Sequence, residues 1–390
     1  MKSSVAVVGG GLVGVTAALR LADLGFPTTL YDRARPEVQR GKLGIDIRNV
    51  ALSPASQALL ADTGAWDKVD PLAYRRMVVW EEWGTSEIVF TAEDLGAVQM
   101  GWIAENSPLV VALWACFEAK AQAAVCLGTI DELCATDEGV TLTMLDGATH
   151  EHDFLIGADG ARSMVREALG VRCHEQPTGH VAIASVVETA AAHEHTAWQR
   201  FLLDGPCALL PGADPHVCSI VWSQSAAQAE RRMALDDGAF CRELTVAMEA
   251  RLGDVVAVDR RIAFPLVQQR ASACQAHARA LLVGDALRVV HPLAGFGVNL
   301  GLEDVARLVE IAQNVEDLAG PGLWRRYAAQ RLARSSAMIN TMAALQTVYA
   351  SPSPAMALLR NVGVRSLNAV DMAKRQIMRE AMGLGPLARL

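Results

Sequence analysis

The amino-terminal pattern of apolar and polar residues predicts a strand, a turn, a helix and a second strand. Residues 5–8 are apolar throughout and mostly β-branched, as in a central strand of a parallel sheet. Residues 15–24 are rich in alanine and leucine and predict a helix that ends at Gly25. Residues 28–31 predict the second strand, with Asp32 at its carboxyl end. This order is typical of parallel sheets whose strands are joined by helices.

The rest of the chain also divides into helical and strand patterns. Ser53-Pro54 combines an N-cap residue with proline at the first helical position, and Asp146-Gly147 is typical of a hairpin turn. The segment 180–264 is rich in strand patterns. Helices are predicted over residues 54–63, 106–124, 226–251, 299–315, 323–350 and 356–383, and strands over residues 140–144, 182–188, 217–222 and 281–285.

These patterns predict an α/β protein in which a Rossmann-type domain is discontinuous in sequence. We assign residues 1–75, 100–178 and 270–335 to that domain. An inserted, mostly β domain that binds the substrate is predicted from residues 76–99 and 179–269. Residues 336–390 form a C-terminal helical region, whose polar side carries basic residues at Arg360, Arg365, Lys374, Arg375 and Arg379.

Composition narrows the class of protein. The chain has 390 residues, of which 52% are hydrophobic, so a disordered or fibrous class is excluded. Its net charge of −8 argues against a general nucleic-acid binder, which needs a basic face. No apolar run approaches the ~20 residues that a membrane span requires, and no signal peptide is expected before the first strand. We therefore expect a cytoplasmic protein whose C-terminal helices offer a contact to the inner face of the membrane or to a biosynthetic complex.

Cysteine and histidine patterns give no metal site. The 8 cysteines never form a C-x-x-C pair, which predicts buried free thiols in a reducing compartment. His150 and His152, like His193 and His195, share one face of a strand, but no third ligand stands at a suitable spacing. We interpret all four as exposed loop histidines.

The turn after the first strand supplies the first candidate chemistry. Gly9, Gly11 and Gly14 have G-x-G-x-x-G spacing around Leu12 and Val13. The first glycine permits a tight turn, the second lets a pyrophosphate approach the backbone, and the third allows the helix to pack closely on the strand. The helix N-terminus then directs free N–H groups at the phosphates, and Asp32 accepts hydrogen bonds from a ribose. This motif alone does not distinguish NAD from FAD.

Three further segments resemble the single-component flavin monooxygenases. Residues 153–163 read DFLIGADGARS, and residues 46–53 read DIRNVALS. Gly284-Asp285 is followed at residues 291–301 by HPLAGFGVNLG. In this order they resemble the para-hydroxybenzoate hydroxylase fold. The chain is most similar, within that fold, to the ubiquinone-biosynthesis hydroxylases, through GWIAEN at residues 101–106, LLRNVG at 358–363 and AMG at 381–383.

The resemblance implies roles for individual residues. Arg48 would lie along the flavin and Asp285 would bind the ribityl hydroxyls. Asp159 and Gly160 would contact the FAD phosphates and NAD(P)H. The ADP half would be held by Gly9, Gly11, Leu12, Val13, Gly14, Asp32, Arg33 and Val125, the flavin ring by backbone N–H groups of Gly295, Phe296, Gly297, Val298 and Asn299, and the reacting centre would be bordered by Pro292, Gly295 and Phe296. From the residues alone, Asp285 is equally open to being an N-cap, Arg48 a surface arginine and Asp159-Gly160 a plain turn.

The sequence also departs from the family pattern around the flavin. Arg288 replaces a histidine and Phe296 a glutamine. Ser107 and Val110 stand where arginine and glutamine are frequent, and Leu287 is bulkier than the usual alanine. Two alternatives therefore stay open. One is a hydroxylase of the same fold that acts on a soluble aromatic or secondary metabolite, and the other is a weakly flavinated, non-catalytic subunit of a quinone-biosynthesis assembly.

The resemblance implies an FAD-dependent monooxygenase. Such an enzyme uses NAD(P)H and O2 to hydroxylate an electron-rich aromatic ring, and the cofactor supplies the difficult chemistry. The substrate class that the resemblance favours is a polyprenylated phenol in ubiquinone biosynthesis. No protein nucleophile or metal ion is required by this chemistry.

Overall fold

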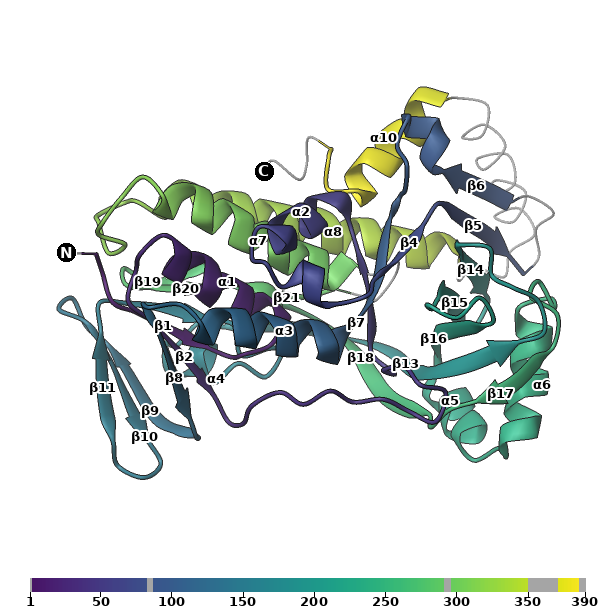
Figure 1. The fold of residues 1–390 in the computed structure, drawn as a ribbon, viewed down its shortest axis with the longest axis horizontal. Coiled ribbons are helices and arrows are strands. Elements are labelled where there is room, and N and C mark those ends of the chain that lie inside the picture. Colours follow the sequence, from purple (N-terminus) through teal and green to yellow (C-terminus); the bar gives the residue numbers. More distant parts are fainter. Residues whose placement is uncertain (1, 83–86, 291–295, 350–370, 386–390) are drawn as a thin grey trace.

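The computed structural model describes residues 2–82, 87–290, 296–349 and 371–385. The molecule is elongated (Figure 1). A sheet covered by helices lies towards the amino terminus, and a larger sheet with its own short helices lies at the opposite end. The two ends have separate hydrophobic cores.

The first sheet is the parallel sheet that the amino-terminal pattern predicts. Its strand order is β19-β20-β12-β1-β2-β8, and every neighbouring pair is parallel except β19 with β20. Because β1 lies between β12 and β2, all four of its residues are buried, which explains why the strand is apolar on both faces. The strands are β1 Val5–Val8, β2 Thr28–Asp32, β8 Ala123–Leu127, β12 Phe154–Gly157, β19 Gln275–His277 and β20 Ala280–Leu282.

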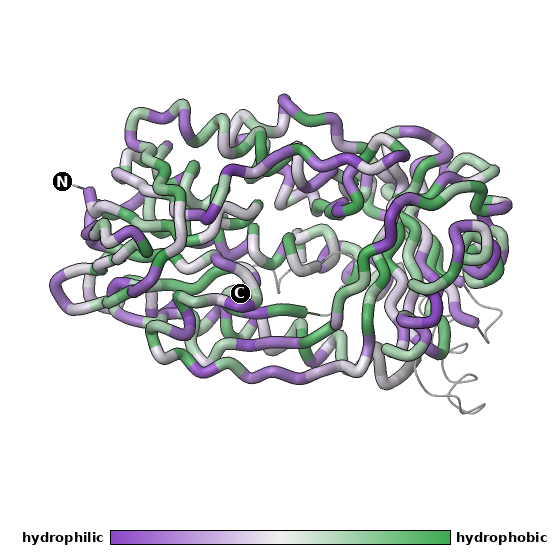
Figure 2. Tube along the Cα trace, turned by 90° about the horizontal axis from the view of Figure 1, so that it is seen from below, coloured by the Kyte–Doolittle hydropathy of each residue, from purple (hydrophilic) through white to green (hydrophobic). Residues whose placement is uncertain are grey.

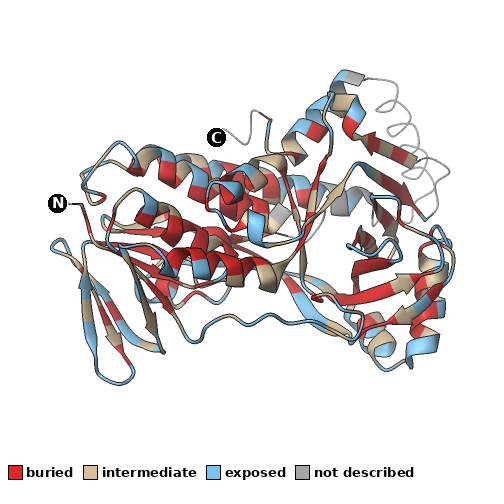
Figure 3. Cartoon of the chain, viewed as in Figure 1, coloured by how far each residue is buried: buried red, intermediate tan, exposed pale blue. Residues whose placement is uncertain are grey.

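Helices and a small sheet enclose this parallel sheet. Helix α1 (Leu12–Asp23) packs against both α3 (Asn106–Glu118) and α7 (Phe296–Ala312). A three-stranded antiparallel sheet adds Leu133 and Leu142 to the same core. The buried residues form a continuous band through the strands and the inner sides of the helices (Figure 3). The small sheet consists of β9 Ile130–Ala135, β10 Val140–Met144 and β11 Thr149–His152.

The second large sheet has nine strands, most of them antiparallel. Its order is β21-β18-β13-β16-β15-β14-β5-β6, with β17 paired to β13. Two helices, α5 (Ala226–Met233) and α6 (Asp237–Ala247), cover one face, where Phe240 and Trp222 share a core. Hydrophobic stretches therefore occur at both ends of the molecule (Figure 2). The strands are β5 Arg76–Glu81, β6 Glu87–Thr91, β13 Cys173–Thr189, β14 Thr196–Leu202, β15 Gly205–Pro211, β16 Val217–Ser225, β17 Val255–Val258, β18 Ile262–Ala271 and β21 Arg288–Val289.

Shorter elements connect the two large sheets. A three-stranded sheet of order β3-β7-β4 lies between them, and helix α8 (Arg325–Tyr349) continues from α7. None of the helices in the described ranges is long and apolar enough to cross a membrane. The remaining elements are β3 Asn49–Leu52, β4 Leu72–Tyr74, β7 Gly101–Glu105, α2 Pro54–Ala61, α4 Met164–Ala168, α10 Asp371–Ala381 and the 3-10 turns η1 Trp66–Lys68, η2 Ala92–Leu95 and η3 Gly284–Ala286.

Two predicted helices are wrong in part. The helix predicted over residues 226–251 is two helices, because the Asp236 carboxylate accepts a hydrogen bond from the backbone N–H of Ala239 and starts α6 anew. The helix predicted over residues 106–124 ends at Glu118, since residues 123–127 form the edge strand β8. A short apolar run in a sequence is compatible with a helix or a strand. Residues 123–127 form a strand because they pair with β2. The predicted Ser53 cap of α2 is confirmed.

Candidate active site

The glycine turn packs too tightly for any side chain at two of its positions. Gly9 has a φ of 106°, and a Cβ there would lie 2.4 Å from the carbonyl oxygen of Ala158. A Cβ on Gly14 would lie 1.9 Å from the carbonyl oxygen of Gly9. A Cβ on Gly11 would meet nothing within 4 Å. Gly9 and Gly14 therefore pack directly against other backbone atoms, whereas Gly11 faces open space.

The open side of the turn presents unpaired backbone donors. Gly11 is the N-cap of α1 and provides no side-chain hydrogen bond to the helix. The first N–H groups of α1 thus remain available for an anion. Leu12 is buried in the core, while Val13 packs beside Gly301 and Gly284, where a Cβ on Gly301 would lie 2.6 Å from its Cγ2.

Asp32, at the carboxyl end of β2, and Trp114, on α3, close the turn. One carboxylate oxygen of Asp32 accepts the N–H of Gly10 at 2.6 Å, and the other accepts the N–H of Arg33 at 2.6 Å. The indole N–H of Trp114 donates to the carbonyl oxygen of Gly10 at 2.7 Å. Sequence analysis missed Trp114, since nothing in the apolar run of its helix distinguishes it from an ordinary core residue.

A groove of about 520 Å³ extends from this turn. It is bordered by α3 and by the loop of residues 33–48, and its lining includes Gly11, Asp32, Arg48, Val110 and Trp114. The Arg48 side chain is exposed in it. Two predicted contacts lie elsewhere. Val125 packs on the core from β8, and Arg33 is exposed but does not line the groove.

Ser107 fixes the loop over the groove. Its hydroxyl oxygen accepts the N–H of Gln39 at 2.9 Å, and its own N–H donates to the Asp46 carboxylate at 2.9 Å. The other oxygen of Asp46 accepts the N–H of Arg48 at 2.9 Å. The serine that departs from the family pattern therefore anchors the segment that carries Arg48.

The Asp159-Gly160 segment is a turn that caps a helix. One carboxylate oxygen of Asp159 accepts the Ser163 hydroxyl at 2.5 Å and the other accepts the N–H of Val165 at 3.1 Å, at the start of α4. Gly160 has a φ of 84°. The buried Arg166 then donates to the carbonyl oxygens of Ala161 at 2.8 Å and Ala286 at 3.0 Å. This arginine ties the turn to η3.

Asp285 lies on η3 and lines a second, larger cavity. Its carboxyl is exposed, but to the cavity and not to the outside of the molecule. Burial raises its pKa above the usual range, the nearby positive charge of Arg288 opposes this effect, and the negative charge of Asp304 adds to it. Asp285 does not cap a helix through its side chain.

A buried ion cluster supports η3 from behind. The Asp304 carboxylate accepts hydrogen bonds from Arg288 at 2.6 Å, Arg331 at 2.6 Å and the N–H of Gly284 at 3.0 Å. All three charged side chains are at most 2% exposed. Burial alone would raise the pKa of Asp304, but the two arginine charges and these hydrogen bonds lower it overall. The departure at Arg288 therefore places a charge pair directly beneath the Asp285 turn.

The start of α7 forms the floor of the cavity. Gly297 and Val298 line it. The Asn299 amide is used within the protein, because it accepts the N–H of Ser53 at 2.9 Å and donates to the carbonyl oxygen of Ala51 at 2.8 Å. Pro292 and Gly295 lie outside the described residues, and of Phe296 only the backbone, as the first residue of α7, is described.

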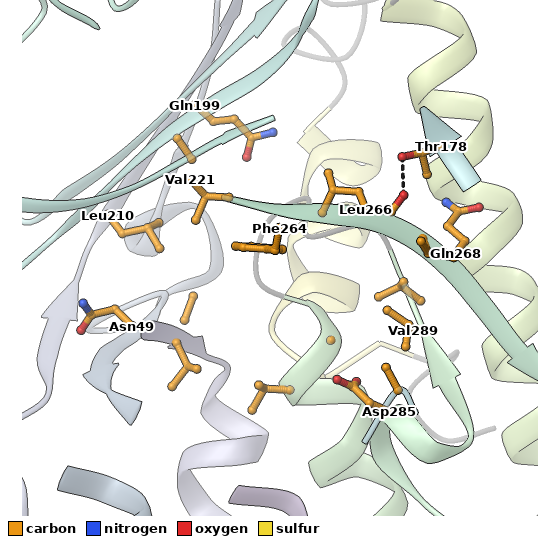
Figure 4. A pocket seen from close by; sticks show the side chains of 18 of the residues that line it. Asn49, Thr178, Gln199, Leu210, Val221, Phe264, Leu266, Gln268, Asp285 and Val289 are labelled. Atoms are coloured by element: carbon orange, nitrogen blue, oxygen red, sulfur yellow. Dashed lines mark hydrogen bonds between the residues drawn. The ribbon is translucent and has the colours of Figure 1, made fainter. Parts of the chain in front are cut away.

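The cavity has a volume of about 800 Å³ and is largely apolar (Figure 4). The nine-stranded sheet forms its roof, through side chains such as Leu210, Val221 and Phe264, and β3 and α7 lie opposite. Burial raises the pKa of Tyr74, at one edge, to about 12. The groove and the cavity meet at the consecutive residues Arg48 and Asn49. A ligand with a diphosphate in the groove and a planar ring in the cavity fits this arrangement, as FAD requires.

The interpretation of the four histidines as exposed loop residues is wrong for three of them, since His150 is a partly buried residue of β11 and only His195 is exposed in a turn. His152 is half-buried on β11, and its Nε2 lies 2.7 Å from the Tyr31 hydroxyl. Burial lowers the pKa of His152 to about 4. His193 is 2% exposed, with Nε2 at 3.0 Å from the carbonyl oxygen of Gly212. All eight cysteines are free thiols, and five are buried.

Comparisons with known proteins agree with this geometry. The family model described as "FAD binding domain" matches residues 2–342. The chain is 33% identical to the 3-demethoxyubiquinol 3-hydroxylase of Escherichia coli (strain K12), over 98% of this chain and 99% of that protein. It is 34% identical to the ubiquinone hydroxylase UbiL of Rhodospirillum rubrum, over 98% of this chain and 91% of that protein.

Solved structures show the same fold at lower sequence identity. The p-nitrophenol 4-monooxygenase PnpA of Pseudomonas putida DLL-E4 superposes with a TM-score of 0.79 at 17% identity, over 99% of both chains. Klebsiella pneumoniae HpxO, in complex with FAD and uric acid, gives a TM-score of 0.76 at 18% identity, over 98% of this chain and 97% of that chain. These structural matches confirm the predicted fold, and the match to the FAD binding domain confirms the predicted FAD cofactor.

Proposed function

The chain belongs to the family of FAD-dependent monooxygenases that carry this FAD binding domain, and we propose that it hydroxylates the aromatic ring of a polyprenylated phenol in ubiquinone biosynthesis. The observation that carries this proposal is the large apolar cavity beside Gly297 and Val298. An aromatic ring with an isoprenoid substituent needs such an enclosure, because transfer of its apolar surface out of water drives its binding. The relatives at 33% and 34% identity are named for hydroxylation in the same pathway.

Each part of the site has a task in this proposal. The free N–H groups at Gly11 bind the FAD diphosphate, and Arg48 and Asp285 hold the chain between diphosphate and ring. Gly297 and Val298 support the ring from the start of α7, where the helix dipole favours negative charge. Residues 1–75, 100–178 and 270–335 bind FAD, and residues 76–99 and 179–269 form the wall that binds substrate.

Water exclusion is the main contribution of the cavity to the reaction. When bound, FAD would accept two electrons and activate O2 for oxygen transfer. Leu210, Val221 and Phe264 keep bulk water from the reacting centre, which protects reactive species from hydrolysis. One oxygen atom of O2 enters the ring and the other leaves as water, so two electrons must come from outside. We propose NAD(P)H as their source.

Purified protein tests the proposal directly. We expect near-stoichiometric FAD, bleaching of its absorbance by NADPH or NADH, and faster NAD(P)H oxidation when a prenylated phenol is added. A protein with no bound flavin and no measurable FAD affinity would overturn the enzyme assignment. In cells that lack the protein, mass spectrometry is expected to show accumulated quinone intermediates, and normal quinone levels would overturn the pathway assignment.

A peripheral membrane contact through α10 is a second part of the proposal. A polyprenylated substrate resides in the bilayer, and α10 exposes Met372 (80%) and Ile377 (48%) beside the cations Arg375 and Arg379. We expect the protein to sediment with vesicles that contain anionic lipid. Substitution of Met372 and Ile377 by serine should release it, and unchanged sedimentation would contradict this contact.

A further inference from the structure

Gln199 stands on the cavity side of strand β14. Its two neighbours face the other way, because Trp198 packs edge-on against Trp80 and Arg200 donates to the carbonyl oxygen of Ala247 at 2.7 Å. Side chains alternate between the two faces of a strand. Gln199 therefore points towards the cavity that it lines, as Figure 4 shows.

The surroundings of this amide are apolar. Gln199 is 5% exposed, and its partners across the neighbouring strands are Val79 on β5 and Ala208 on β15. Leu210 and Val221 continue the same wall. Within the described ranges, the Gln199 amide has no hydrogen-bond partner, and it is not sealed off by protein. A buried amide without a partner is unfavourable, and such groups are rare in folded proteins.

Three of the other amide and hydroxyl side chains along the cavity are engaged or partly enclosed. The Asn49 amide donates to the carbonyl oxygen of Asp46 at 2.7 Å, and the Thr178 hydroxyl donates to the carbonyl oxygen of Leu266 at 2.7 Å. Gln268 also lines the cavity, but its amide nitrogen is enclosed by protein. Gln199 combines access to the cavity with an unpaired amide.

We infer that Gln199 is a specificity-determining residue whose amide hydrogen-bonds an oxygen substituent of the substrate's aromatic ring. The amide nitrogen donates to a methoxy or carbonyl oxygen, and the amide as a whole both donates to and accepts from a hydroxyl group. A ring with carbon at that position would leave the amide unpaired inside an apolar wall, so the cavity selects oxygen-substituted rings. This inference rests on the proposed function, because it requires an aromatic substrate in the cavity.

A panel of short-chain prenylated phenols tests the assignment. In each compound the oxygen of one ring substituent is replaced by carbon, for example a methoxy group by an ethyl group. Dissociation constants are measured from the perturbation of the flavin absorbance spectrum, which needs no turnover. For one replacement, we expect the wild-type protein to lose about 10- to 100-fold in affinity. For that same replacement, Gln199→Leu should lose less than about threefold in affinity, because this variant lacks the amide hydrogen bond to the parent compound as well.

The controls separate the possible failures. Gln313→Leu, at an exposed position that does not line the cavity, should leave the affinities for all compounds unchanged. FAD content and melting temperature show whether each variant is folded. If Gln199→Leu does not fold, Gln199→Met replaces it in the test. Equal replacement penalties in the wild type and both Gln199 variants, at every ring position, would overturn the inference and leave the proposed function intact. A wild-type holoprotein that binds no prenylated phenol would overturn the proposed function, and this inference with it.

Discussion

Under the proposed function, the groove would meet the FAD diphosphate mainly through backbone N–H groups, whereas the cavity would meet the substrate mainly through side chains. Gly9 and Gly14 allow the turn and helix to pack so closely that the N–H groups at Gly11 are left open. The cavity is instead lined by side chains from segments that are far apart in the chain, from Asn49 on β3 to Val289 on β21. Backbone groups offer the same chemistry whatever the side chains are, while an apolar wall changes with each substitution. Under the proposed function, the groove would therefore determine that FAD binds, and the cavity would determine which ring reacts.

The largest effect is expected where buried charges support the cavity end of the site. Asp304→Asn removes the negative charge that Arg288 and Arg331 share. Loss of one partner of a buried ion pair costs about 3–5 kcal/mol, and Gly284 loses a charged acceptor as well. We expect lower stability in denaturant titrations, and a greater loss of affinity for FAD than for ADP. Glu310→Gln, in an exposed pair with Arg307 on the same helix, is the control and should change stability by less than about 1 kcal/mol. Equal effects of the two variants would contradict the role of the cluster.

Two glycine variants break the groove in different ways. Gly14→Ala should lower FAD affinity by about 100-fold, because its methyl group would displace the Gly9 carbonyl and overpack the turn. Gly11→Ala has room in the protein and should leave the fold intact. Its methyl group would lie where the diphosphate approaches, and we expect about tenfold weaker binding. Fluorescence titration of apoprotein with FAD measures both. If Gly11→Ala binds FAD as the wild type does, the diphosphate does not occupy that space.

A variant of the cavity wall should separate substrate binding from FAD binding. Val221→Phe adds bulk in the middle of the wall, and we expect KM for the phenol to rise about tenfold. FAD affinity should stay within about twofold, because the groove is untouched. Steady-state kinetics and FAD titration give the two quantities. Val256→Phe adds the same bulk at a position that is 56% exposed, and should change neither. A parallel loss of FAD in Val221→Phe would show that the two regions are not independent.

The smallest effect is expected from the pH dependence of the contact between His152 and Tyr31, beside Asp32 of the groove. Burial lowers the pKa of His152 in the folded protein to about 4, below the ordinary histidine value of 6.5. Between these values the unfolded chain binds more protons than the folded one, so stability falls as the pH falls from 6.5 towards 4. After allowance for solvent screening, we expect a loss of about 1 kcal/mol at pH 5, or about 2 °C in melting temperature. His152→Gln should lose less between pH 7 and pH 5, and an equal loss would refute the assignment.

The sequence predicted the groove better than the cavity, for a physical reason. Gly9, Gly11, Gly14 and Asp32 lie close together in the chain, and their spacing reflects local backbone geometry. Trp114 and Gln199 carry no such signal, because Gly10 and Val79, which they contact or pair with, come from distant segments. The same limit explains the histidines. The burial of His152 depends on Tyr31, a contact across 121 positions of the chain.

The order of strands in the parallel sheet also governs how the protein is made. Val5 on β1 pairs with Phe154, and Leu155 pairs with Ala280. At about 5–20 residues per second, a ribosome needs on the order of ten seconds to supply β12 after β1, and longer to supply β20. Throughout that interval one edge of an entirely apolar strand has no partner, which is a hazard for aggregation. The glycine turn is synthesised before Ala158, whose carbonyl group packs against Gly9, so the turn cannot be completed until that residue is available. We therefore expect the nascent chain to expose the edge of β1 for longer than the edges of strands whose partners are close in sequence.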